Sequence, residues 1–138
     1  MASNTMKMLR KFIEFTTQNK GFDRVCDKII PVAGTPGKCK FSLKVDEGHL
    51  NTGGTLHGGL TATLVDSLTT AAIMTAGGSP GVSVDLNVTY MKAVKEGETI
   101  SINAEVLKLG KRLAFTTCDI SNENGILIAQ GRHTKFVG

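Results

Sequence analysis

The segment Asn51-Thr-Gly-Gly-Thr-Leu-His-Gly-Gly-Leu-Thr-Ala-Thr-Leu-Val-Asp66 joins a glycine-dense turn to an apolar run that contains one carboxylate. Four glycines within seven residues allow backbone angles and close approaches that side chains would forbid; they are Gly53, Gly54, Gly58 and Gly59. A turn of this kind at the start of a helix presents backbone N–H groups to a ligand oxygen. Asp66 is the only acidic residue between Glu47 and Asp85, so the segment combines hydrogen-bond donors with an isolated carboxylate.

The run that follows the turn, Leu60 to Ala76, predicts a long helix. It contains no Gly or Pro, and its leucines Leu60, Leu64 and Leu68 are spaced four residues apart. The sequence Gly77-Gly-Ser-Pro80 is typical of a helix end. Because small and apolar residues cover nearly the whole circumference, we expect a sheet to enclose this helix.

Strands are indicated on both sides of the helix. We interpret Phe22–Val32 as a first strand that ends at Pro31 and a Gly34–Gly37 turn, and Lys38–Val45 alternates as a half-buried second strand does. Turns containing glycine separate four later strands, expected at Val82–Tyr90, Thr99–Leu107, Leu113–Ser121 and Ile126–Thr134. The predicted fold class is α+β, an antiparallel sheet of about six strands wrapped around the long central helix.

The N-terminal segment has the pattern of an amphipathic helix that docks on its own domain. Its apolar residues recur at helical spacing, at Met6, Leu9, Phe12, Ile13 and Thr16. It lacks the long apolar region and small-residue cleavage site of a secretory signal. We expect a cytoplasmic protein.

Composition limits the function classes. The 138 residues suit one domain, residues 1–138, and with 41% hydrophobic and 20% charged residues the chain reads as a soluble globular protein without a membrane span. The net charge of +4 admits an anionic partner, but with no Trp and one Tyr, nucleic acid is not expected. Three separated cysteines and three histidines without paired spacing indicate no disulfide framework and no metal site.

Asp66 is the leading candidate for chemistry. On a helix it shares a face with small or apolar residues, so its carboxylate loses solvation unless hydroxyls such as those of Thr63 or Thr70, or a residue from a strand, compensate. One interpretation is a structural aspartate bonded to such hydroxyls or facing solvent at a helix edge. The other is a general base or nucleophile.

The remaining candidates have both structural and chemical interpretations. His57 is expected to brace the turn, which leaves the N–H groups of Gly58 and Gly59 free to polarise a carbonyl as in an oxyanion hole. Asn51 could donate to a carbonyl, but an amide that satisfies the turn is favoured. Ser83 is expected to face the same way as Asp85 and Asn87, and could hold a water or mark a strand end. Nothing in the spacing places it near Asp66.

Taken together, these residues resemble a known family. The pattern Asn51-x-x-Gly54-Thr-x-His57-Gly58-Gly59, then Asp66, Pro80-Gly-Val-Ser83-Val-Asp-Leu-Asn-x-Thr-Tyr90 and Ile128-Ala-Gln-Gly-Arg-His-Thr-Lys135, resembles the hotdog-fold acyl-coenzyme A thioesterases of the phenylacetate-pathway type. The resemblance implies dimers that pair into a homotetramer and hydrolyse medium- and long-chain acyl-CoA without a cofactor. It also implies association with mitochondria and a lipid-transfer protein as a candidate partner.

The resemblance assigns roles to individual residues. Asp66 corresponds to the base or nucleophile, Ser83 to the residue that orients the attacking water, and Asn51 with the Gly58 N–H to the contacts with the thioester carbonyl. In this family the aspartate and the asparagine-glycine side come from different subunits. The CoA nucleotide would follow two basic clusters and their surroundings: Glu47, Tyr90, Met91, Lys92, Ala93, Val94, Lys95, Lys108, Leu109, Gly110, Lys111, Arg112, Leu113 and Phe136.

Two alternatives remain open. The chain could be a non-catalytic module of the same fold that binds acyl-CoA or a lipid-associated protein. It could also be a hotdog dehydratase with His57 as base, although the Pro-rich context of that group is absent. Differences from the family at Thr52, Gly53 and Arg112 concern chain-length preference and CoA affinity more than the reaction.

Overall fold

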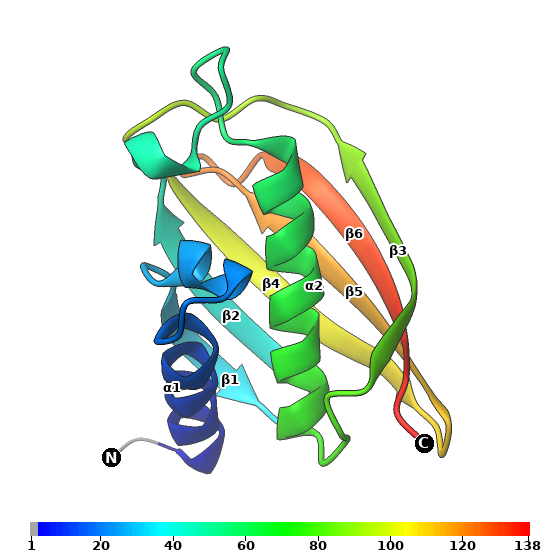
Figure 1. Cartoon of the computed structure of the whole chain (residues 1–138). Coiled ribbons are helices and arrows are strands. Elements are labelled where there is room, and N and C mark those ends of the chain that lie inside the picture. The colour runs from blue at the N-terminus through cyan, green and yellow to red at the C-terminus, as the bar shows by residue number, and fades with distance from the viewer. Residues whose placement is uncertain (1–2) are drawn as a thin grey trace.

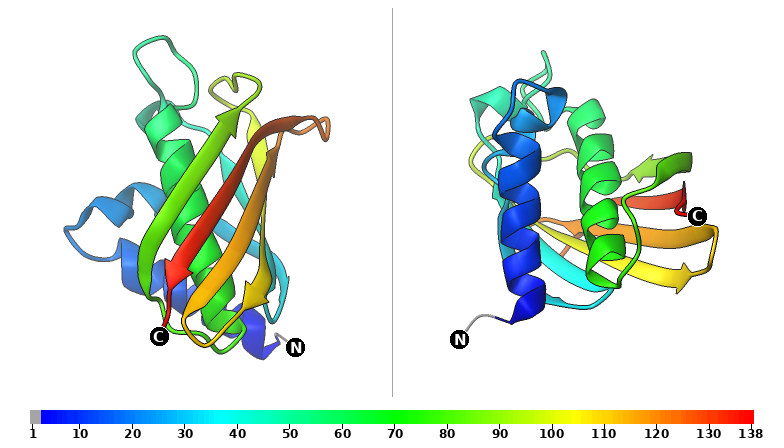
Figure 2. Two further views of the ribbon diagram at one scale, coloured as in Figure 1. Left: turned by 90° about the vertical axis from the view of Figure 1, so that its right-hand side faces the viewer. Right: turned by 60° about the horizontal axis from the view of Figure 1, so that its bottom comes forward.

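The computed structural model describes residues 3–138. Its elements are α1 (Asn4–Thr17), η1 (Phe22–Cys26), β1 (Ile30–Thr35), β2 (Lys38–Lys44), η2 (Glu47–His49), α2 (Gly58–Thr75), β3 (Val82–Tyr90), β4 (Thr99–Leu109), β5 (Leu113–Ser121) and β6 (Leu127–Phe136) (Figure 1). Six strands form one antiparallel sheet in the order β1-β2-β4-β5-β6-β3. The sheet curls around α2, and α1 lies beside α2 (Figure 2). The predicted α+β arrangement is confirmed.

The central helix α2 packs its apolar residues against the inner face of the sheet. Leu64, Val65 and Leu68 are completely buried there. Gly77, with a φ of 92°, follows the last turn, where a residue with a side chain would be strained. The side of α2 that faces away from the sheet is only partly covered; it carries Ala62, Thr63, Asp66, Ser67 and Met74. Within one chain the sheet therefore encloses α2 on one side only.

Close packing between α2 and β6 depends on Gly131. A Cβ atom added there would lie 2.5 Å from Cγ1 and 2.7 Å from Cγ2 of Val65. We expect Gly131→Ala to lower the free energy of unfolding by about 1–3 kcal/mol, because the helix would have to move away from the sheet. Urea denaturation measures this change. Gly48→Ala is the matched control, since its Cβ would make only an ordinary contact, 3.4 Å from Asp46 Oδ1. Equal losses in the two variants would contradict the packing argument.

The predicted strand Phe22–Val32 is wrong over its first half. Phe22–Cys26 forms a 3-10 helix, in which Arg24 N–H donates to the Gly21 carbonyl and Asp27 N–H to the Arg24 carbonyl. Adjacent apolar residues in this stretch lack the alternation that a half-buried strand needs. The strand β1 starts at Ile30, and its hairpin turn is Pro36–Gly37, with φ of 80° at Gly37. Gly34 lies inside β1, where a Cβ atom would come within 3.0 Å of Leu9 Cδ1 and Thr5 Cγ2 of α1.

The helix α1 confirms the amphipathic N-terminal prediction. Its Thr5, Leu9 and Ile13 side chains are buried, and the helix packs mainly on β1 and η1. Met8 and Phe15, by contrast, are exposed. No helix within residues 3–138 is both long and apolar enough to span a bilayer.

The strand β3 is an edge strand with an unusually apolar surface. In the described part of the chain it pairs only with β6, and Val82, Val84 and Leu86 are 68%, 60% and 39% exposed. An edge with open backbone groups and apolar side chains is a template for pairing with another strand. Within residues 3–138, the outer edge of β3 is therefore unpaired.

Candidate active site

The turn before α2 is held by the Asn51 side chain. Its Oδ1 accepts hydrogen bonds from the N–H groups of Gly53 (2.9 Å) and Thr55 (3.1 Å), while Nδ2 donates to Thr55 Oγ1 at 3.0 Å. The interpretation of Asn51 as a turn-forming residue is confirmed. The amide nitrogen carries two hydrogens, so one of them stays free to donate to a ligand.

His57 caps α2, which confirms its bracing role and corrects one detail. Its Nδ1 accepts the hydrogen bond of the Gly59 N–H at 2.9 Å, so that N–H is not free. The Gly58 N–H donates to none of the acceptors within residues 3–138, and it points out from the positive end of the helix dipole. The Gly58 carbonyl accepts from Tyr90 Oη at 2.6 Å. Of the two glycine N–H groups predicted to be free, only that of Gly58 is available to a ligand.

Asp66 is half exposed, whereas its small and apolar neighbours on the helix had suggested a carboxylate removed from solvent. Its side chain is 49% exposed on the open side of α2. The hydroxyl of Thr70 donates to the Asp66 main-chain carbonyl at 2.8 Å and not to its carboxylate. A carboxylate half in solvent needs no compensating hydroxyl, and it can accept a proton from a bound water.

Ser83 faces α2 because of a β-bulge. Asp85 pairs with Thr134 and Ser83 with Lys135, so Val84 is the extra residue on β3. Strict alternation would place Ser83 on the outer face with Asp85, and this prediction is wrong. The bulge shifts the side-chain direction by one residue. The Ser83 hydroxyl then lies 2.7 Å from Nε2 of His133.

His133 lies beside both Ser83 and Asp66. Its ring is completely buried, with Nε2 3.7 Å from Asp66 Oδ1 and Nδ1 2.8 Å from Thr69 Oγ1. The single hydroxyl hydrogen of Thr69 is used by the Val65 carbonyl at 2.7 Å, so Thr69 Oγ1 accepts from the His133 Nδ1–H. This assigns the tautomer from the hydrogen-bond geometry: Nε2 carries a lone pair and accepts the Ser83 hydroxyl hydrogen.

Burial keeps His133 neutral. Desolvation lowers the pKa of its imidazole below the ordinary value, and the charge of Lys135 adds to this shift, whereas the Asp66 and Asp85 carboxylates oppose it. The contact with Asp66 is therefore not an ion pair at neutral pH. With its hydrogen donated to His133, the Ser83 oxygen presents lone pairs to a water hydrogen.

Lys135 is a second buried polar residue next to Asp66. Its ammonium donates to Thr70 Oγ1 at 2.8 Å. Burial lowers the pKa of Lys135 below its ordinary value, and the Asp66 carboxylate partly offsets that shift. The sequence-based prediction missed both His133 and Lys135. Their signal was present: both lie on the inward row of the last strand, where a polar side chain needs a partner.

The predicted catalytic residues form two groups within one chain. Asp66 and Ser83 meet through His133, while Asn51 and Gly58 belong to the turn. Asp66 lies eight residues beyond Gly58 on α2, which is about 12 Å along the helix axis. A substrate carbonyl that accepts a hydrogen bond from Gly58 is too far from Asp66 to be attacked by a water that Asp66 activates, since each of these contacts spans only about 3 Å. Each chain thus carries two half-sites.

The predicted CoA contacts also separate. Glu47 and Tyr90–Lys95 lie at the end of the sheet near the Asn51 turn, and Lys108–Leu113 and Phe136 lie at the opposite end (Figure 1). Val94 is 1% exposed and packs its side chain in the core, and its predicted place beside the CoA nucleotide stays a prediction. The two basic clusters do not meet within one chain.

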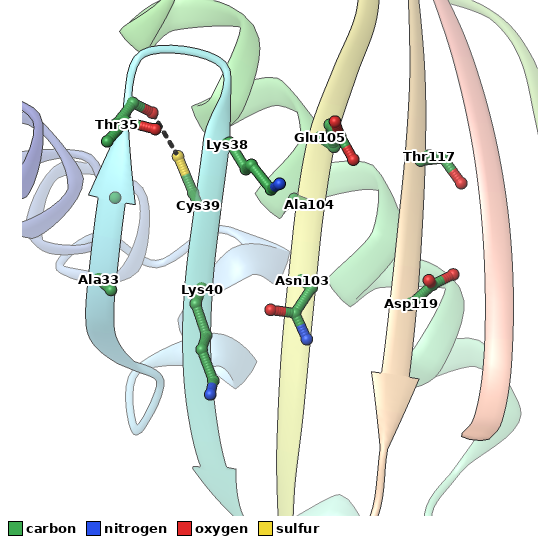
Figure 3. A pocket seen from close by; sticks show the side chains of 11 residues that line it. Ala33, Thr35, Lys38, Cys39, Lys40, Asn103, Ala104, Glu105, Thr117 and Asp119 are labelled. Carbon is green, nitrogen blue, oxygen red and sulfur yellow. Dashed lines mark hydrogen bonds between the residues drawn. The ribbon is translucent and has the colours of Figure 1, made fainter. Parts of the chain in front are cut away.

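One hollow on the surface lies away from both half-sites. It has a volume of about 410 Å³ and lies on the outer face of β1, β2, β4 and β5, with Lys38, Lys40, Asn103, Glu105 and Asp119 around it (Figure 3). It contains none of the predicted catalytic residues. Within residues 3–138, no three His, Cys, Asp or Glu side chains cluster as metal ligands.

Comparison with known proteins agrees with the fold. The thioesterase superfamily profile matches residues 53–129, more than half of the chain. Acyl-coenzyme A thioesterase 13 of Homo sapiens is 55% identical over 132 residues, which cover 94% of both chains. The crystal structure of zebra fish thioesterase superfamily member 2 is 52% identical, with a TM-score of 0.94 over 99% of this chain and 100% of that one.

A more distant solved structure was determined with coenzyme A. This hypothetical thioesterase protein of Streptococcus pneumoniae TIGR4 is 27% identical and gives a TM-score of 0.76 over 79% of this chain and 87% of its own. The matched profile includes the glycine turn, Asp66 and Ser83. With its six-stranded sheet curled around α2, this chain is an enzyme of the thioesterase superfamily and has the hotdog fold.

Proposed function

We propose that this chain hydrolyses the thioester of medium- and long-chain fatty acyl-CoA, with a water activated by Asp66. The observation that carries the proposal is the Asp66–His133–Ser83 arrangement, which presents a carboxylate and a hydroxyl oxygen side by side. Relatives named acyl-coenzyme A thioesterase 13 and the likeness to a structure with coenzyme A support the substrate class. Basic residues at both ends of the sheet suit the CoA phosphates.

The reaction follows from these positions. Asp66 removes a proton from the water while Ser83 holds the other hydrogen, and the water oxygen bonds to the thioester carbon. The carbonyl π electrons move to oxygen, where the Gly58 N–H and the Asn51 amide stabilise the negative charge. The carbon–sulfur bond then breaks, and the proton on Asp66 passes to sulfur. Fatty acid and CoA thiol are the products.

The complete site requires two chains. If two β3 edges pair antiparallel about a two-fold axis, the Asn51 turn of one chain comes to the Asp66 side of the other. The same operation brings Tyr90–Lys95 of one chain to the end of the partner that carries Lys108–Leu113. Two observations support this dimer. The β3 surface is apolar and exposed, and Gly58 and Asp66 of one chain are about 12 Å apart along α2, which is about eight helical rises. A homotetramer would pair two such dimers.

The state of His133 sets a pH dependence. Its folded-state pKa is lowered, so the neutral form predominates at pH 7 and is lost only as the pH falls through that lowered value. The imidazolium carries N–H on both nitrogens, so Nε2 can no longer accept from Ser83 and instead donates toward Asp66. We expect kcat/KM to fall on acidification, with a midpoint below 6.5, the ordinary value for histidine.

The pH profile of kcat/KM, measured beside that of His133→Gln, tests this assignment. The amide of the variant can still accept from Ser83 but does not titrate, so its acidic limb should be displaced from that of the wild type. The same midpoint in both proteins would assign the limb to another group.

A thiol-release assay with acyl-CoA esters of four to sixteen carbons tests the proposed function. We expect turnover that increases from the short to the medium and long chains. Saturable binding of acyl-CoA without thiol release would instead identify a non-catalytic module. If turnover were lost in His57→Ala but retained in Asp66→Asn, the base would be the histidine.

A further inference from the structure

Lys135 places a buried positive charge next to the candidate base. It lies on the inward row of β6, and only 6% of its surface is exposed. Its ammonium group donates to Thr70 Oγ1 at 2.8 Å, and the Thr70 hydroxyl in turn donates to the Asp66 main-chain carbonyl at 2.8 Å. All three residues border the same hollow of about 270 Å³ on the open side of α2. The last strand thus brings a cation to the helix turn that carries the carboxylate.

The position of Lys135 is unfavourable for an ammonium group taken by itself. A cation that leaves water loses solvation, and a single hydroxyl acceptor returns only part of it. Burial accordingly lowers the pKa of Lys135, whereas the Asp66 carboxylate favours the charged ammonium and partly offsets that shift. The attraction between the two groups is mutual. The ammonium therefore favours the charged form of the carboxylate by the same interaction energy.

The hydroxyl groups around Asp66 donate their hydrogens elsewhere. The Thr63 hydroxyl donates to a main-chain carbonyl one turn earlier, and the Thr70 hydroxyl donates to the main chain of Asp66. Ser83 donates to His133, whose Nε2 lies 3.7 Å from Asp66 Oδ1 and carries a lone pair. A lone pair does not stabilise a carboxylate. These neighbours leave the charged form of Asp66 to solvent water and to the buried cation.

The proposed dimer takes solvent away from Asp66. Its side chain is 49% exposed in one chain, and in the complete site the Asn51 turn of the partner and the substrate come to this side of α2. Loss of solvent favours the neutral form of a carboxyl group. A protonated Asp66 could not remove a proton from the attacking water. A cation that is already buried before the site closes can keep the carboxylate charged when the water leaves.

We propose that Lys135 is a positioning residue, which keeps Asp66 in its charged form in the assembled site. It acts through its charge and through the hydrogen bonds by way of Thr70, and no step requires it to touch the water or the substrate. The inference rests on the proposed function, in which Asp66 is the base. Loss of the charge should move the acidic limb of the pH profile to higher pH, while the rate on the plateau above that limb is kept.

Other ionisable groups also act on this position, and the test must separate them. Burial lowers the pKa of His133, the charges of Asp66 and Asp85 oppose that shift, and the charge of Lys135 adds to it. Asp23 borders the same hollow from η1. The variants are therefore compared in a His133→Gln background, where this position no longer titrates. Asp23 and Asp85 are unchanged in every protein of the series.

Two variants remove the charge, so that the test does not depend on the folding of one protein. Lys135→Met keeps the apolar stem of the side chain, and Lys135→Gln keeps a donor for Thr70. Lys135→Arg retains the positive charge. Lys44→Met is the matched control, because it removes the same charge from an exposed position of β2. Circular dichroism and size-exclusion chromatography with light scattering establish the fold and the oligomeric state.

Two titrations are measured for each protein. One is the pH profile of kcat/KM for dodecanoyl-CoA. The other is ¹³C NMR of the labelled aspartate carboxyl carbons, in which the Asp66 signal is assigned by its loss in Asp66→Asn, and this readout needs no turnover. We expect both acidic midpoints to rise by about one pH unit in Lys135→Met and Lys135→Gln, within the range for loss of a nearby opposite charge. Lys135→Arg and Lys44→Met should keep the midpoint of the parent.

Several results would overturn the inference. Unchanged midpoints in the two uncharged variants would show that Lys135 does not control the ionisation of Asp66. A shift of equal size in Lys44→Met would mean that any positive charge on the protein has the same effect. A rate lowered equally at every pH, without a shift of the midpoint, would restrict Lys135 to a role in the fold.

These outcomes are distinct from failure of the proposed function. If the wild type releases no thiol from dodecanoyl-CoA, or if Asp66→Asn retains full turnover, the proposed function and this inference are lost together. If the wild type hydrolyses the ester through Asp66 and neither titration responds to Lys135, the reaction stands and only the role of Lys135 is lost.

Discussion

Asp66→Asn is expected to lower kcat by about 10³-fold, within the range of about 10² to 10⁴ that a general base contributes. The amide has almost the shape of the carboxylate but cannot take a proton from water. Because the Asp66 side chain is half exposed and Thr70 donates to its main-chain carbonyl, not to its carboxylate, the fold should be retained. The measurement is the steady-state rate of thiol release from a long-chain acyl-CoA, with thermal unfolding as the control for stability.

The same position distinguishes water attack from direct attack by the carboxylate. During a single turnover in ¹⁸O-labelled water, we expect label in the fatty acid and none in Asp66, since the proposed mechanism has Asp66 activate a water that Ser83 holds. Label in the Asp66 carboxylate after turnover would show a covalent anhydride with the enzyme. Wild-type turnover in Asp66→Asn would remove this residue from the reaction altogether.

Mixing two inactive variants is expected to restore activity. Asp66→Asn disables one half-site and Asn51→Ala the other, and the loss of one oxyanion donor costs about 10² to 10³ in kcat. If each complete site takes Asp66 from one chain and Asn51 from its partner, a mixed dimer has one doubly impaired site and one intact site. Random re-assortment should then recover about one quarter of the wild-type rate, from half of the dimers with half of their sites.

The experiment needs dimers that contain one chain of each variant. Co-expression of the two variants with different tags, followed by purification on both tags, provides them. Purified mixed dimers should then show about half of the wild-type rate per dimer, with one intact site of two. No recovery beyond the average of the parent variants would mean that both half-sites act within one chain, contrary to their separation along α2. Leu86→Arg, which charges the β3 edge, should abolish both dimer formation and recovery.

The regular elements could be predicted from local sequence patterns. β3 has the predicted bounds, Val82–Tyr90, and α2 starts within two residues of the prediction, because periodicity and glycine stops act over a few residues. The bracing of the turn by Asn51 and His57 was predictable for the same reason. The strand prediction failed at Phe22–Cys26, although the composition of this stretch is compatible with a strand. Its backbone instead forms the hydrogen bonds of a 3-10 helix, with the carbonyls of Gly21 and Arg24 as acceptors.

The candidate site was predictable only in part. The resemblance named Asp66, Ser83, Asn51 and Gly58, but their relation in space depends on the tertiary structure. Alternation along β3 would have turned Ser83 away from α2, and the bulge at Val84 reverses this. His133 and Lys135 received no role from the resemblance, and they matter because the register of β6 places them under α2.

The sequence by itself determined a long apolar helix, its glycine turn, an antiparallel sheet and an isolated carboxylate, since each of these is encoded by neighbouring residues. Only the tertiary structure decided that Asp66 is half exposed, that His133 links it to Ser83, and that the Asn51 turn lies too far along α2 to share a site with it in one chain. These relations join residues distant in sequence. Strand register, a single bulge and the close approach at Gly131 set them, and such features arise from packing between elements.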